Sequence, residues 1–168
     1  MLVSSVVLGV AGGLLFGGKW RRIGALRIRW WPVLAAAATL RVAGVLLPLD
    51  LVAYLGGVLA VAVVALRNAA LPGGALIAIG SLLNALVFIV NGGMPYDPAA
   101  AEAAMIRPLL NDRLHFEASA DTRLAFLSDV IYLPIFRNVY SVGDVVIAAG
   151  GFWLPFRWLR AKTRAEGS

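Results

Sequence analysis

Five long apolar runs constrain the fold of this chain more than any other feature of its sequence. Hydrophobic residues make up 61% of its 168 residues and charged residues only 14%, which is more apolar surface than one small water-soluble domain can bury. The sequence therefore predicts an integral membrane protein, a single all-α domain over residues 1–168 built as a polytopic bundle of five transmembrane helices. We expect the spans at about residues 2–18, 32–47, 51–66, 71–90 and 142–156.

The basic residues predict which way the bundle faces. Ten Lys and Arg residues fall in the segments that five spans place on one side, and only four fall in the long segment on the other side. Positive charge collects on the cytoplasmic side of a membrane, so we expect a protein of the cytoplasmic membrane with its N-terminus outside and its C-terminus cytoplasmic. If residues 2–18 did not span, four spans with the same inner and outer faces would remain.

Composition also limits the expected ligands. The chain has no cysteine and one histidine, His115, so neither a thiolate site nor a histidine cluster is available and no metal or cofactor is expected. The segment from Lys19 to Trp31 is basic and aromatic, which is the usual anchor of a span at anionic headgroups. We therefore expect membrane lipids, and other membrane protein subunits, as partners in preference to nucleic acid.

Residues 91–141 form the only long polar segment between apolar runs, and they are predicted to lie outside the membrane. Asp97 followed by Pro98 predicts an N-cap and a first-turn proline, hence a short interfacial helix to about Ile106. Residues 124–140 mix aromatic, β-branched and charged types and predict a short strand or an interfacial loop. Ser141 is expected to cap the last helix, with Asp144 in its first turn.

Two polar residues inside predicted spans are candidate binding residues. Arg41 is costly in lipid, so we expect it to pair with Asp129 or Asp144 or to line a cavity, and the alternative is that it reaches outward to the headgroups. Asn84 lies at mid-depth in its span, where an asparagine usually bonds a neighbouring helix.

The run Asn91-Gly92-Gly93 is a third candidate binding element. One interpretation is a turn, in which Asn91 closes the preceding helix, the glycines adopt positive φ and Pro95 prevents the helix from continuing. The other is a cradle of backbone N–H groups for an anionic lipid or substrate group.

Four motifs resemble a bacterial family of small polytopic membrane proteins known only as a domain of unknown function. They are Trp30-Trp31-Pro32, the hallmark Asn91-Gly-Gly-Met-Pro, Asp121-Thr-Arg-Leu with Asp129-Val-Ile, and Ser141-Val-Gly-Asp-Val-Val-Ile. The resemblance covers nearly the whole chain and implies no activity.

The C-terminal part also resembles the end of prolipoprotein signal peptidases, which are membrane-embedded aspartyl peptidases. The matching stretches are Ser128-Asp129-Val130-Ile131 and Ser141-Val142-Gly143-Asp144. This resemblance implies that Asp129 and Asp144 form a catalytic pair at the outer face, where one carboxyl acts as a base toward water and the other as an acid.

Three functions remain open from the sequence. The first is an accessory or lipid-contacting membrane subunit without enzymatic chemistry. The second is an aspartyl peptidase-like enzyme that uses Asp129 and Asp144, and the third is a small transporter with a polar path through Arg41, Asn84 and Asp144.

Overall fold

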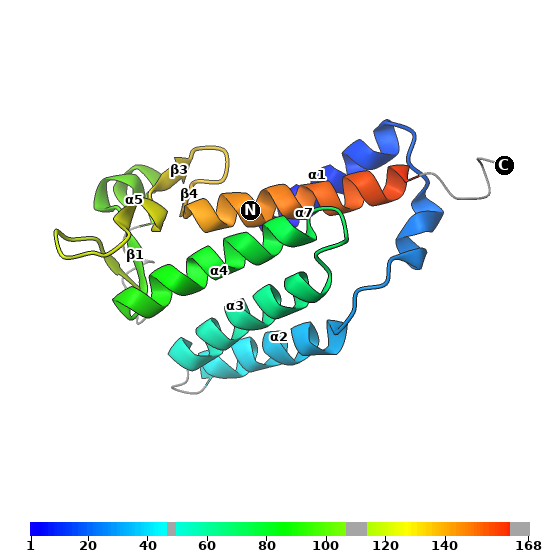
Figure 1. Ribbon diagram of the computed structural model, residues 1–168. Helices are drawn as coiled ribbons and strands as arrows, with labels where there is room; N and C mark the ends of the chain where they lie inside the picture. Colours follow the sequence, from blue (N-terminus) through cyan, green and yellow to red (C-terminus); the bar gives the residue numbers. More distant parts are fainter. Residues whose placement is uncertain (47–49, 107–113, 162–168) are drawn as a thin grey trace.

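The computed structural model describes residues 1–46, 50–106 and 114–161, with the backbone alone for residues 41, 44–46 and 50. The chain is mainly helical, and five long helices run alongside one another (Figure 1). Neighbouring helices pack in the order α1, α7, α4, α3, α2. Their bounds are α1 Leu2–Leu15, α2 Trp31–Leu46, α3 Asp50–Arg67, α4 Gly74–Asn91 and α7 Val142–Arg160.

These helices occupy the five predicted ranges, but three of their ends differ from the prediction by more than one residue. α1 ends at Leu15 instead of residue 18, and Gly17 in the turn that follows has φ +85°. α4 begins at Gly74 instead of residue 71, because Gly73 precedes it with φ +82°. Such left-handed backbone is accessible to glycine and ends a helix. α7 continues past residue 156 to Arg160.

α1 lies against the C-terminal half of α7 and stops short of the other end of the bundle (Figure 1). A Cβ at Gly151, near the middle of α7, would lie 2.7 Å from Leu2, and a Cβ at Gly13 would lie 2.9 Å from Leu159. The 14 residues of α1 rise about 21 Å at about 1.5 Å each, whereas the predicted span over residues 2–18 would rise about 26 Å.

Short strands make the all-α prediction wrong for residues 91–141, although a short strand or loop was expected within residues 124–140 and strands are present there. β1 pairs in parallel with β2, and β3 pairs with β4 in an antiparallel hairpin. Outside its short helices the backbone of this segment has no helical hydrogen bonds, so its N–H and C=O groups pair between short strands. The elements, which gather at one end of the bundle, are β1 Met94–Tyr96, α5 Pro98–Ala104, β2 His115–Glu117, η2 Ala125–Leu127, β3 Ile131–Leu133 and β4 Asn138–Tyr140.

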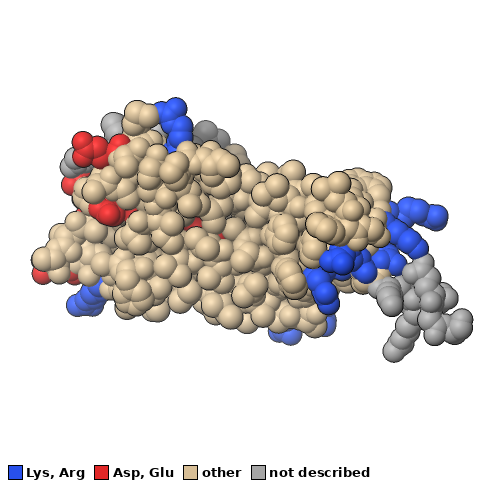
Figure 2. All heavy atoms as spheres, turned by 90° about the horizontal axis from the view of Figure 1, so that it is seen from above, with Lys and Arg blue, Asp and Glu red and all other residues tan. Residues whose placement is uncertain are grey.

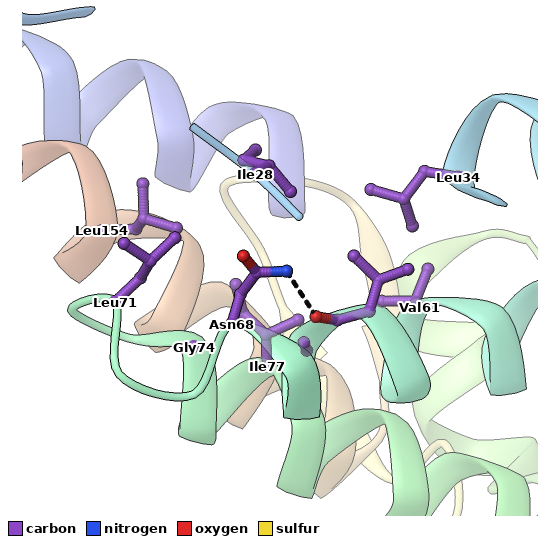
Figure 3. A pocket seen from close by; sticks show the side chains of 10 residues that line it. Ile28, Leu34, Val61, Asn68, Leu71, Gly74, Ile77 and Leu154 are labelled. Carbon is purple, nitrogen blue, oxygen red and sulfur yellow. Dashed lines mark hydrogen bonds between the residues drawn. The ribbon is translucent and has the colours of Figure 1, made fainter. Parts of the chain in front are cut away.

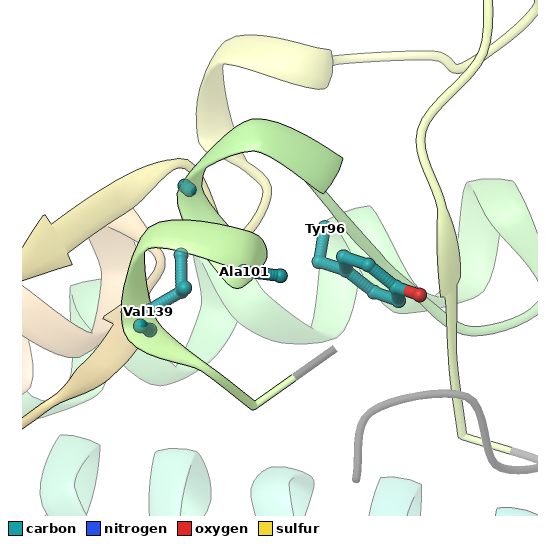
Figure 4. Close-up of a cluster of buried hydrophobic side chains, with 5 residues drawn as sticks. Tyr96, Ala101 and Val139 are labelled. Atoms are coloured by element: carbon teal, nitrogen blue, oxygen red, sulfur yellow. The ribbon is translucent and has the colours of Figure 1, made fainter. Parts of the chain in front are cut away.

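The predicted short helix of this segment is present as α5. The Asp97 carboxylate accepts a hydrogen bond from the N–H of Ala99 at 2.9 Å, and Pro98 is the first helical residue. α5 places Ala101 against Tyr96 and Val139 in a small separate core (Figure 4). The strand end of the bundle is therefore a packed cap with its own apolar interior.

Glycines bring α4 and α7 into backbone contact. A Cβ at Gly143 would lie 2.6 Å from the carbonyl oxygen of Gly80, and a Cβ at Gly150 would lie 2.7 Å from that of Gly73. Any larger side chain at these positions would have to push the helices apart. Close packing of small residues is typical of helix pairs in membranes.

The sides of the bundle are apolar, and its charges lie at the ends. Figure 2 shows most Lys and Arg at one end of the visible face, most Asp and Glu at the other, and an uncharged stretch between them. Large apolar side chains are exposed on all five long helices, for example Val3, Val42, Val52, Ile79, Ile89 and Trp153. Within the described residues one helix, α4, is long and apolar enough to cross a membrane, and the apolar parts of α1, α2 and α3 are shorter.

Candidate functional site

A polar cluster forms where α7 begins. The Ser141 hydroxyl accepts a hydrogen bond from the N–H of Asp144 at 2.9 Å, and the Asp144 carboxylate accepts from the N–H of Ser141 at 3.3 Å. This reciprocal capping box satisfies two N–H groups that a helix start would leave unpaired. The predicted cap at Ser141 is confirmed, and it fixes the Asp144 carboxylate over the first turn of the helix.

Asn84 joins this cap to α4. Its side-chain nitrogen donates to Asp144 at 2.8 Å, and its side-chain oxygen accepts from the Ser141 hydroxyl at 2.8 Å. Asn84 is only 5% exposed, so these bonds are made away from water. The expectation that Asn84 bonds a neighbouring helix is confirmed, and its partner is the predicted site residue Asp144.

Asp129 reaches the same region from the strand end. Its N–H donates to the carbonyl of Pro95 at 3.0 Å, its carbonyl accepts from the N–H of Asp97 at 2.9 Å, and the residue is 7% exposed. Burial, followed by the negative charge of Asp144, raises the pKa of Asp129 from 3.8 to about 8. At neutral pH the buried carboxyl is therefore mostly protonated.

An apolar groove of about 490 Å³ opens beside the polar cluster, between the α2–α3 pair and the α4–α7 pair. Asn84 and Asp144 lie in its wall together with Ser81, which is one turn before Asn84 on α4 and is 1% exposed. Within the described part of the chain the Ser81 hydroxyl has no hydrogen-bond partner. The other lining residues are Leu2, Leu34, Ala37, Ala38, Tyr54, Gly57, Val58, Val61 and Ile147.

Comparison with known families assigns residues 26–156 to a family of unknown function, DUF5317. The chain belongs to this family. The match covers most of the chain and includes Ser81, Asn84, Asp129 and Asp144. No curated protein and no solved structure matches the chain.

In this DUF5317 chain the run Asn91-Gly92-Gly93 forms a turn. Asn91 is the last residue of α4, and Gly92 follows with φ +72°. The Asn91 side chain accepts from the N–H of Arg123 and donates to its carbonyl, both at 2.9 Å. The Asn91 side chain therefore binds the backbone of a loop that is distant in the sequence, which favours the turn interpretation over an anion cradle.

Asn68 makes the same kind of contact at the other end of the bundle. It follows α3, accepts from the N–H of Arg29 and donates to the Arg29 carbonyl, both at 2.9 Å. It also donates to the carbonyl of Val64 at 2.7 Å, and it lies in the wall of a small cavity of about 100 Å³ (Figure 3). The sequence analysis missed Asn68, although a polar residue at a helix end before a short turn was the available signal.

Two further expectations concern this site. The Arg41 side chain lies outside the described residues, so its pairing with Asp129 or Asp144 stays a prediction. Among the described residues no group of three or more His, Cys, Asp or Glu side chains is placed to hold a metal ion. The residues that the structure brings together are Ser81, Asn84, Ser141 and Asp144, with Asp129 close enough for its pKa to respond to Asp144.

Proposed function

We propose that this chain is a multi-span membrane protein that binds a lipid-like amphipathic molecule in the groove between α2, α3, α4 and α7. The observation that carries the proposal is the placement of Ser81, Asn84 and Asp144 in the wall of an otherwise apolar groove. A mostly apolar pocket with a few converging polar groups is the common form of a small-molecule site. Its volume of about 490 Å³ is of the size such sites have.

The membrane part of the proposal rests on the distribution of charge and apolar surface. Helices α2, α3, α4 and α7 have 16 to 19 residues, which rise about 24 to 28 Å, close to an apolar bilayer thickness of about 30 Å. The placement of α1 against one half of α7 favours four crossing helices over the five that the sequence predicted. The basic η1 end (Trp20–Ala25) then faces the cytoplasm and the strand end faces outside.

The absence of cysteine from the sequence makes this topology directly testable. Ala120→Cys lies in the strand end and Gly24→Cys in the η1 end, and both positions are exposed. A membrane-impermeant maleimide added to intact cells should label the first variant and should label the second only after the cells are opened. Labelling of both variants in intact cells, or of Gly24→Cys alone, would contradict the orientation.

Binding in the groove can be tested by photo-crosslinking. The purified protein in lipid nanodiscs should be labelled on α2, α3, α4 or α7 by a diazirine-bearing dodecanol. Ala37 lines the groove, so Ala37→Phe should suppress this labelling. Ala36→Phe is the matched control, because Ala36 is exposed on α2 away from the groove. Equal labelling of both variants would contradict binding in the groove. Cross-links to a protein partner in cells would favour the accessory-subunit alternative.

The raised pKa of Asp129 favours a second candidate function, an aspartyl peptidase-like enzyme. A protonated Asp129 is able to donate a proton to a scissile carbonyl while Asp144 accepts one from water. Water adds across the amide bond and the products are a carboxylic acid and an amine. Release of peptide from a lipid-anchored peptide, measured by mass spectrometry and lost in both Asp129→Asn and Asp144→Asn, is the expected result. Turnover that persists in either variant would exclude the pair.

A further inference from the structure

We propose that the groove selects an amphipathic molecule whose polar head donates hydrogen bonds and carries no negative charge, such as a long-chain alcohol or amine. This inference rests on the proposed function and specifies the chemistry of its ligand. It follows from the hydrogen-bonding capacity that Ser81, Asn84 and Asp144 leave unused.

Asn84 uses half of its hydrogen-bonding capacity to hold Asp144 in place. Its oxygen accepts from Ser141 with one lone pair, and its nitrogen donates one of its two N–H groups to Asp144. The Ser141 hydroxyl donates to Asn84 and accepts from the N–H of Asp144. These two side chains position Asp144, and the second N–H of Asn84 is able to meet the oxygen of a hydroxyl head.

Asp144 has acceptor capacity to spare. From the described residues its two oxygens each accept one bond, Oδ1 from Asn84 and Oδ2 from the N–H of Ser141. Acceptance at both oxygens is the pattern of an ionised carboxylate, which offers about four lone-pair sites in all. The remaining lone pairs can only accept hydrogen bonds. A hydroxyl or an ammonium head is able to donate to them, whereas an ionised carboxylate or sulfonate head has no hydrogen to donate.

Ser81 supplies a second contact for the same head. Its hydroxyl is buried and pairs with no described residue, and Ser81 lies in the wall of the groove. Burying a hydroxyl without a hydrogen bond is unfavourable, so a bound polar group that pairs with it recovers that cost. A serine hydroxyl donates one bond and accepts others, which suits an alcohol or amine that pairs with Ser81 and Asp144 together.

The charge of the groove points to the same head group. Among the described lining residues Asp144 is the only charged side chain, and the rest of the wall is apolar apart from Ser81, Asn84 and Tyr54. An anion brought beside Asp144 loses its hydration and meets a like charge. A neutral donor or a cation meets no such repulsion.

Competition against the diazirine-bearing dodecanol in nanodiscs tests this inference. The competitors are dodecanol, dodecylamine and dodecanesulfonate, which share one chain and differ only in the head. A hydrogen bond to a charged group strengthens binding about tenfold or more. Dodecanol and dodecylamine should therefore reduce cross-linking at about one-tenth or less of the concentration that dodecanesulfonate needs. Ser81→Ala should reduce this difference in effective concentration between the donor heads and the sulfonate. Ser119→Ala, the same change at an exposed site, should leave the difference unchanged.

The outcomes separate the inference from the proposed function. Equal competition by all three molecules, or stronger competition by the sulfonate, overturns the inference while groove binding stands. A preference that Ser81→Ala does not change overturns the role given to Ser81. If even excess dodecanol fails to compete, the proposed groove binding fails and the inference fails with it.

Discussion

Replacing Asp129 by asparagine should stabilise the protein at alkaline pH. The pKa of Asp129 is raised from 3.8 to about 8, so the folded state binds a proton that the unfolded state has released over this range. The stability of the wild type should therefore fall as pH rises from about 4 to about 8 and should lose nothing more from this group at higher pH. Asparagine has the shape of the protonated acid and does not titrate, which removes this dependence.

The magnitude follows from the pKa shift. A rise from 3.8 to about 8 corresponds to roughly 6 kcal/mol at about 1.4 kcal/mol per unit, as an upper figure for a fully buried group. Burial is the larger cause of the shift and the charge of Asp144 the smaller. The Asp129→Asn variant should gain several kcal/mol over the wild type at pH about 8 and close to nothing at pH about 4.

The assay is equilibrium unfolding by sodium dodecyl sulfate in mixed micelles, followed by tryptophan fluorescence across this pH range. Asp121→Asn is the matched control: Asp121 is exposed in the same segment, so the same change of charge there relieves no burial cost. No gain in stability for Asp129→Asn at pH about 8, or a gain that does not shrink toward pH about 4, would contradict the raised pKa of Asp129.

Three other substitutions test the packing that holds the site. Gly143→Ala puts a methyl group against Asn84 and should cost about 1 to 3 kcal/mol in the same assay, whereas Gly57→Ala, with open space around it, should cost nothing. Ser141→Ala removes the helix cap and should lower stability by about 1 to 2 kcal/mol. Asn68→Ala frees the backbone of Arg29, so limited proteolysis should cut faster there than in the wild type.

Local signals allowed much of the fold to be predicted. Apolar runs between glycines, prolines and charges predicted where the long helices lie, because each helix bonds its own backbone and needs no distant partner. The caps at Asp97 and Ser141 were equally readable, since a cap bonds N–H groups only two or three residues away. Helix ends were harder to predict than helix positions. The left-handed φ angles of Gly17 and Gly73 interrupt the helical backbone beside α1 and α4, and hydropathy does not show such angles.

The candidate site was only partly predictable for the opposite reason. Asp144 and Asn84 were identified singly as polar residues in or beside apolar helices, but their bond joins residues 60 positions apart. The burial of Ser81, and the lack of a partner for its hydroxyl among the described residues, depend on how α4 lies against its neighbours. No periodicity in the sequence carries that information.

Composition and hydropathy were enough to predict a largely helical, apolar chain with its charges between the helices, because both act on each segment separately. Three features became visible in the packed bundle alone: Asn84 binds the cap of α7, Asp129 is buried within reach of the charge of Asp144, and a groove opens beside them. These features arise from the packing of whole helices against one another, where glycine pairs such as Gly80 and Gly143 set how closely the backbones approach.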